Sequence, residues 1–144
     1  DPYARGTILG ITRGTTAAHL ARASLESMAY QPRDLIEAMQ KDAGITLDVL
    51  KVDGGASVND AGIQFQSGIR GSKIKRTVGS GTNGLGAAYL AGLAVGFWED
   101  MQDVSRNWVL DRLFEPAMSE EDRDNRYLRW QRAVTRTLDW EERQ

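Results

Sequence analysis

The longest hydrophobic pattern along the chain is helical. It begins after a pair of threonines and ends near Gly44, and small or apolar residues recur in it at three- and four-residue spacing: Leu20, Ala21, Ser24, Leu25, Met28, Leu35, Ile36 and Met39. This spacing predicts one long amphipathic helix with a threonine as N-cap. Pro32 lies inside the pattern, where it removes a backbone donor and crowds the carbonyl group of Met28, so we expect the helix to bend or divide near Gln31.

Three shorter patterns predict strands. Residues 7–11 form an apolar run between glycine-containing segments, which is typical of a buried strand. Residues 50–52 end an apolar run at a glycine turn, and they predict a second strand. Residues 72–77 alternate Ile74 with three basic residues, and because those side chains require solvent we expect this strand near a sheet edge.

The longest apolar run, residues 85–98, is rich in alanine and glycine. It has about fourteen residues, fewer than the roughly twenty that a membrane-spanning helix needs. The run therefore predicts a buried helix that packs closely against a sheet or another helix, and we expect no membrane partner.

The C-terminal third of the chain ends in an amphipathic pattern. Residues 103–116 contain scattered apolar anchors and predict a connecting segment. Ser119 and Asp122 have the spacing of a capping box. The helix predicted after them has four apolar residues on one face: Tyr127, Trp130, Val134 and Leu138.

The candidate binding site is the turn after residues 50–52. There Asp53 is followed by Gly54 and Gly55, then by small residues and by Asn59 at the start of a helical pattern. Consecutive glycines permit positive φ and carry no Cβ, so a flat or anionic ligand can lie against the backbone of Gly54 and Gly55. The amide of Asn59 can cap the helix or reach a bound group. The alternative is a turn between a strand and a helix that binds nothing.

Two other features are weaker candidates. The glycine-rich segment 79–84 has the composition of a flexible loop or a linker, and a phosphate-binding role is less favoured because it lacks the lysine of a P-loop. His19 is the single histidine, with no second histidine or carboxylate next to it in sequence, so we expect a structural role for it.

The composition is that of one globular domain covering residues 1–144. The chain is 41% hydrophobic and 26% charged, and 18 basic against 20 acidic residues leave a formal charge of -2. This charge offers no reason to bind nucleic acid. Cysteine is absent and the N-terminus has no signal-peptide pattern, so we expect a cytoplasmic protein without disulfides.

Four blocks together resemble the C-terminal part of the glycerol kinases, in the FGGY family of carbohydrate kinases: Asp1–Gly6, Leu25–Gln31, Val52–Ala56 and Leu85–Trp98. The resemblance implies an α/β fold, an actin-like or ribonuclease-H-like ATPase lobe that is incomplete and comprises the C-terminal portion only. It also implies that this lobe holds the adenosine part of ATP or ADP, with nucleotide contacts at Gly55 and Asn59 and with Gly54 beside them.

The resemblance further implies transfer of the γ-phosphoryl group of Mg-ATP to glycerol. Glycerol and the catalytic aspartate belong to an N-terminal lobe upstream of Asp1, and magnesium is held mainly by parts outside this chain. We therefore assign no catalytic residue and no metal ligand, and we expect the isolated chain to be an inactive fragment. The alternative is a non-catalytic lobe that folds, self-associates or binds nucleotide weakly. An exposed sheet edge or apolar patch predicts a homo-oligomer.

Overall fold

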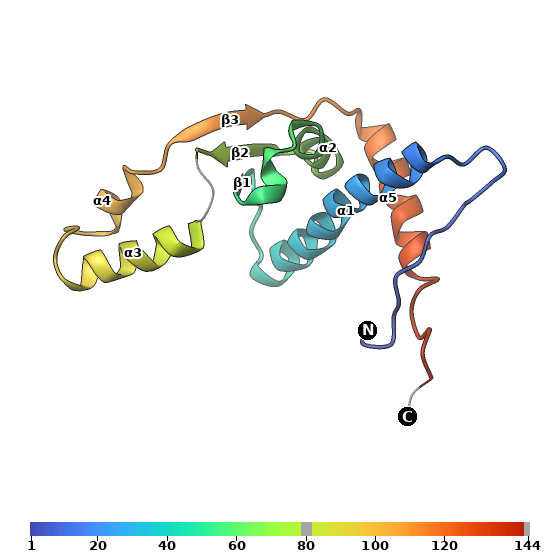
Figure 1. Cartoon of the computed structure of the whole chain (residues 1–144), viewed down its shortest axis with the longest axis horizontal. Helices are drawn as coiled ribbons and strands as arrows, with labels where there is room; N and C mark the ends of the chain where they lie inside the picture. Colours follow the sequence, from blue (N-terminus) through green and yellow to red (C-terminus); the bar gives the residue numbers. More distant parts are fainter. Residues whose placement is uncertain (79–81, 143–144) are drawn as a thin grey trace.

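The computed structural model describes residues 1–78 and 82–142 and has a mixed α/β architecture (Figure 1). Its elements in chain order are α1 (Ala17–Ala43), β1 (Val49–Val52), η1 (Gly55–Val58), α2 (Asp60–Arg70), β2 (Lys73–Thr77), α3 (Thr82–Ala94), α4 (Met101–Ser105), β3 (Leu110–Phe114) and α5 (Glu120–Val134). The strands form one sheet in the order β1-β2-β3, with β1 parallel and β3 antiparallel to β2. The α2 crossover thus joins the two parallel strands.

Two clusters of buried residues hold the helices and the sheet together. Ile63 of α2 packs against Ile74 of β2 and Phe114 of β3, and this cluster attaches α2 to the sheet. Tyr30 of α1, Ile69 of α2 and Tyr127 form the second cluster, which joins three helices. Because α2 belongs to both clusters, it is the centre of the core.

The long N-terminal helix is confirmed, and of the two outcomes expected near Gln31, a bend or a division, the division does not occur. α1 is one continuous helix from Ala17 to Ala43 with Pro32 inside it. Tyr30 is buried just before the proline, and just after it Arg33 donates to the Ile69 carbonyl oxygen at 2.8 Å. Packing on both sides therefore outweighs the roughly 3 kcal/mol that an internal proline costs.

Two of the predicted strands differ from the structure. Residues 7–11 form no strand, and Ile8 and Ile11 are 64% and 62% exposed, because the described sheet does not extend to them. β2 is the central strand rather than an edge strand. Two of its basic residues form ion pairs, Lys73 with Glu115 at 2.9 Å and Arg76 with Asp60 at 2.7 Å.

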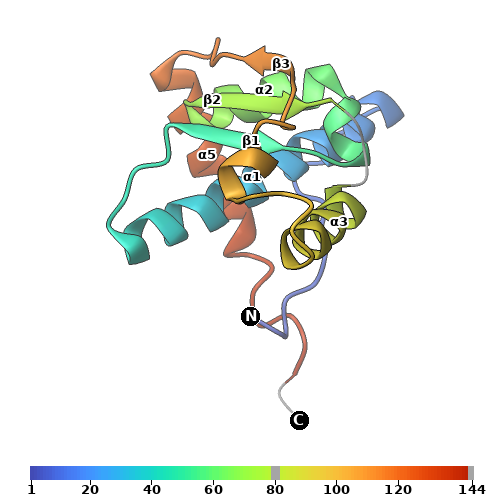
Figure 2. The ribbon, with the colours of Figure 1, turned by 90° about the vertical axis from the view of Figure 1, so that its left-hand side faces the viewer.

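The predicted buried helix at residues 85–98 is exposed in this chain. Leu90 and Val95 are 68% and 81% exposed. α3 lies apart from α1, α2 and α5 in Figure 1, and it is among the elements nearest the viewer in Figure 2. Its close packing is internal: Trp98 folds back over Gly92, where a Cβ atom would lie 2.6 Å from the Trp98 ring. Residues 79–81 of the predicted glycine-rich loop lie outside the described residues, and the rest of that segment belongs to α3.

The C-terminal helix is confirmed, with Ser119 as its N-cap accepting from the Asp122 amide at 3.2 Å. Leu138 lies beyond its end and is 44% exposed. The predicted connecting segment before it contains α4 and β3, so that prediction is wrong for residues 110–114. None of the helices in the described part of the chain is both long and apolar enough to cross a bilayer.

Candidate functional site

The turn after β1 has the conformation that its glycines predict. Gly54 adopts φ +93°, a region that favours glycine, and it precedes the short helix η1. The carbonyl oxygen of Gly54 accepts two bonds from Ser57, from its amide at 3.0 Å and from its hydroxyl at 2.7 Å. Gly54 therefore redirects the chain, and Ser57, which is buried, closes the turn.

Asn59 is the N-cap of α2. Its side-chain oxygen accepts from the Gly62 amide at 3.0 Å, which satisfies one of the amide groups that a helix start leaves unpaired. The side chain is exposed, so its amide nitrogen is available to a ligand that lies over the turn. Capping and ligand contact, which the sequence left as alternatives, are compatible here.

The surface over the turn is open. A Cβ atom built on Gly54 or on Gly55 would meet no other atom within 4 Å, and Gly55 is exposed. A flat group can therefore approach the backbone at both glycines, and the N-terminal end of α2 lies beside it. An exposed backbone of this kind is compatible with a nucleotide base or ribose lying against it, so the residues present fit an adenosine group.

Charged residues support the turn from the sheet side. Arg76 of β2 donates to the Ser57 carbonyl oxygen at 2.8 Å and to Asp60 at 2.7 Å, and Arg112 also pairs with Asp60. The hydrogen bond from Arg76 lowers the pKa of Asp60 below its usual value, with a further contribution from Arg112. A carboxylate held ionised in this way is a weak proton acceptor, which argues against Asp60 as a catalytic base.

The sequence singles out Gly54, Gly55 and Asn59 as contact residues, which stays a prediction. It did not predict that Ser57, Asp60 and Arg76 hold the turn in place. A serine in a glycine-containing turn often bonds to nearby backbone, so the role of Ser57 could have been predicted from the sequence. The role of Arg76 could not, because its place opposite Val52 depends on the register between β1 and β2.

The other polar residues considered have structural roles. His19 Nδ1 accepts from the Thr16 amide at 3.1 Å and completes the start of α1. Within residues 1–78 and 82–142, no three histidine or carboxylate side chains gather where they could hold a metal ion.

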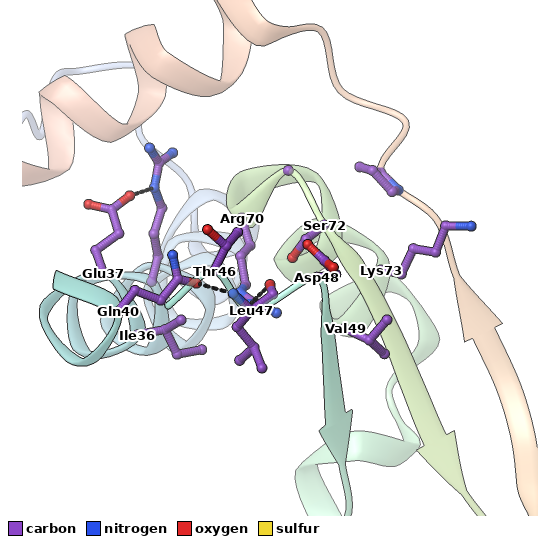
Figure 3. A pocket seen from close by; sticks show the side chains of 13 residues that line it. Ile36, Glu37, Gln40, Thr46, Leu47, Asp48, Val49, Arg70, Ser72 and Lys73 are labelled. Atoms are coloured by element: carbon purple, nitrogen blue, oxygen red, sulfur yellow. Dashed lines mark hydrogen bonds and ion pairs between the residues drawn. The ribbon is translucent and has the colours of Figure 1, made fainter. Parts of the chain in front are cut away.

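A cavity lies at the opposite end of the parallel strands from the glycine turn, beside the first residues of β1 and β2 (Figure 3). Its volume is about 460 Å³. Its polar side chains fasten the loop before β1: Gln40 accepts from the Leu47 amide at 3.2 Å and Arg70 donates to the Leu47 carbonyl oxygen at 2.7 Å. None of the three predicted contact residues lines it, so the glycine turn is the candidate site.

Comparison with known proteins identifies the family. The profile of the C-terminal domain of the FGGY family of carbohydrate kinases matches residues 1–95. The chain belongs to this family. It is 54% identical over 143 residues to glycerol kinase 2 of Thermotoga maritima and 56% identical over 142 residues to the glycerol kinase of Deinococcus radiodurans. Each match covers 99% of this FGGY chain but only 29% and 28% of the relative, so the chain spans less than a third of the length of these relatives.

Solved structures of the family agree with this fold. A glycerol kinase of Plasmodium falciparum, solved with ADP, superimposes with a TM-score of 0.81 at 37% identity over 94% of this chain and 27% of that one. A ligand-bound xylulose kinase of Lactobacillus acidophilus superimposes with a TM-score of 0.74 at 21% identity over 94% of this chain and 27% of that one. The expected actin-like, ribonuclease-H-like ATPase fold is confirmed for this C-terminal portion.

Proposed function

We propose that this chain is the ATP-binding portion of a glycerol kinase, which phosphorylates glycerol to glycerol 3-phosphate with Mg-ATP. The observation that carries the proposal is the open turn at Gly54 and Gly55, with Asn59 beside it, in a chain more than half identical to glycerol kinases. The similarity to a glycerol kinase solved with ADP supports a nucleotide as the ligand.

In this proposal the chain contributes binding and orientation. The backbone at Gly54 and Gly55 receives the adenosine group, and the amide of Asn59 holds it from the start of α2. Phosphoryl transfer depends mainly on positioning and on neutralising charge, so a rigid adenosine site helps by aligning the γ-phosphate with the acceptor.

The remaining functions belong to other parts of the kinase. We assign the catalytic base, the glycerol site and most magnesium ligands to an N-terminal lobe that closes over this one. Two lobes that close over ATP and glycerol would exclude water, which otherwise competes as acceptor.

The test is reconstitution. ADP release in the presence of glycerol is measured for the chain alone, for the part of the Deinococcus radiodurans glycerol kinase that this chain does not match, and for the two mixed. We expect activity only in the mixture, dependent on glycerol and magnesium. Activity in the mixture that is unchanged by Asn59→Ala and Gly55→Val would contradict the assignment of the turn.

A second candidate function is a non-catalytic lobe that folds, self-associates or binds nucleotide weakly. The exposure of α3 and of the residue that follows it favours this candidate, because Leu90 and Val95 are 68% and 81% exposed in this chain. No ADP release from the mixture, together with saturable nucleotide binding by the chain alone, would select this alternative.

A further inference from the structure

We propose that Arg76 is the positioning residue of the adenosine site: it holds the turn that the nucleotide contacts without touching the nucleotide itself. The inference rests on the proposed function, since it concerns the same turn. Gly54 and Gly55 have no side chains that could fasten η1 to the rest of the protein, so other residues must hold the turn in place.

Arg76 holds the turn from the side of the sheet. One terminal nitrogen of its guanidinium group donates to the Ser57 carbonyl oxygen in η1 at 2.8 Å and to the Asp60 carboxylate at 2.7 Å. These two partners flank Asn59, the N-cap of α2. A single side chain on β2 thus fixes the chain on both sides of the residue proposed to hold the nucleotide.

The arginine is itself held rigidly. Its Nε donates to Asp111 of β3 at 2.5 Å, its guanidinium lies 5.3 Å from the centre of the Phe114 ring, and its side chain is only 14% exposed. The turn is therefore tied through Arg76 to two strands of the sheet.

The hydrogen bonds of Arg76 also argue against direct contact between its side chain and the nucleotide. Two of its three guanidinium nitrogens, Nε and Nη1, are committed to Ser57 and to two carboxylates, so the side chain is poorly available to a phosphate group. Arg112 shares Asp60 but makes no bond to Ser57, and its side chain is 53% exposed. Arg112 is therefore a matched control: the same charge is removed from the same carboxylate, and the contact with the turn is kept.

The test compares the 144-residue chain with Arg76→Gln, Arg76→Lys and Arg112→Gln. ADP is titrated into each 15N-labelled protein and the dissociation constant is taken from amide shifts. We expect Arg76→Gln to weaken ADP binding by about tenfold or more, Arg76→Lys to recover part of the loss because lysine keeps the charge but not the forked geometry, and Arg112→Gln to change binding less than about threefold.

A second measurement separates positioning from general destabilisation. Amide hydrogen exchange in Arg76→Gln should accelerate at Ser57 and Ile63, whose amides bond within the turn and the α2 cap, and stay unchanged at Leu20 in the first turn of α1. Equal ADP affinity in Arg76→Gln and in the parent overturns the inference while the proposed function stands. If the parent chain binds no ADP, the proposed site fails in this chain, and unchanged exchange at Ser57 then overturns the role of Arg76 as well.

Discussion

The two adjacent glycines of the site have different physical functions. Gly54 has φ +93°, so its contribution is a backbone conformation that other residues reach only with strain. The φ of Gly55 is not positive, and a Cβ atom there would meet nothing within 4 Å, so its contribution is empty space. Substitutions at the two positions should therefore produce different defects.

At Gly55, valine should abolish nucleotide binding while the protein stays folded. Its side chain fills the space over the turn that the base or ribose needs, and the backbone tolerates it. In the parent chain we expect ATP, ADP and AMP to bind with similar dissociation constants on the order of 1 mM, since about 4 kcal/mol of binding free energy comes from adenosine contacts alone. Titration of both proteins with all three nucleotides is the measurement.

Gly54→Ala is the control for that experiment. It should lower the free energy of unfolding by roughly 1–3 kcal/mol because alanine is strained at this φ. A site in the parent that strongly prefers ATP over AMP, or normal binding by Gly55→Val, would contradict the adenosine assignment.

At the scale of the elements, a polar clamp fastens α1 to α5. Asp34 accepts from the Tyr127 hydroxyl at 2.5 Å and from the Trp130 indole nitrogen at 2.6 Å. Arg33 lies 3.6 Å above the centre of the Tyr127 ring. These contacts begin directly after Pro32, and they explain why the helix continues through the proline.

The contacts of Asp34 and Arg33 with α5 predict that α1 forms despite Pro32, and that the proline destabilises the protein. Pro32→Ala restores a backbone donor for the Met28 carbonyl oxygen, so the free energy of unfolding should rise by about 1–3 kcal/mol. Urea denaturation measures the change, and Gln31→Ala, at an exposed neighbouring position, should shift stability by less than about 0.5 kcal/mol. A loss of stability in Pro32→Ala would mean that the α1 packing depends on the proline ring.

The same clamp predicts a loss of stability at alkaline pH. Burial raises the pKa of Tyr127 well above its usual value, and the hydrogen bond to Asp34 and the charges of Asp34 and Glu37 raise it further. The unfolded chain releases this proton near pH 10, whereas the folded chain retains it, so stability is intact below about pH 10 and falls as the pH rises toward the raised pKa.

Tyr127→Phe tests this dependence. The variant should lose about 1–3 kcal/mol at pH 7 because bonds to charged acceptors are removed, and its stability should decline less steeply above pH 10. Part of the decline should remain, because burial also raises the pKa of Tyr30. Thermal unfolding from pH 7 to pH 11 distinguishes the two proteins, and parallel curves would exclude Tyr127 as the titrating group.

At the scale of the whole molecule, the exposed surface of α3 predicts self-association. Leu90 of α3 is 68% exposed, and Val95 and Phe97, which follow the end of the helix, are 81% and 73% exposed. The helix lies apart from α1, α2 and α5 (Figure 1). Exposed apolar patches of this kind favour contacts between copies. We expect light scattering to give an apparent mass that rises with protein concentration.

The double variant Leu90→Glu with Val95→Glu should reduce this rise, because it places charge in the patch. Leu128→Glu, which changes a residue 58% exposed on α5, should leave it in place. A parent chain that remains monomeric at high concentration, with cooperative unfolding, would contradict the prediction.

Local patterns determined much of this protein. The threonine start and Gly44 end of α1, the strand before the glycine turn and the cap at Ser119 all depend on groups within a few residues of one another, and each was predicted. The turn conformation at Gly54 and the helix cap at Asn59 follow in the same way, because a strand, a turn and a helix start are consecutive in sequence. The nucleotide contacts of Gly54, Gly55 and Asn59 stay a prediction.

Contacts between distant segments decided the rest. The continuity of α1 through Pro32 depends on partners near residues 69 and 127, and the central place of β2 depends on β3, which lies more than thirty residues away in sequence. α3 has the composition of a buried helix, yet burial requires a second surface, and the described part of this chain does not place one over it. Arg76 supports the turn because the parallel register sets it opposite Val52, and a register is a property of the folded sheet rather than of either strand.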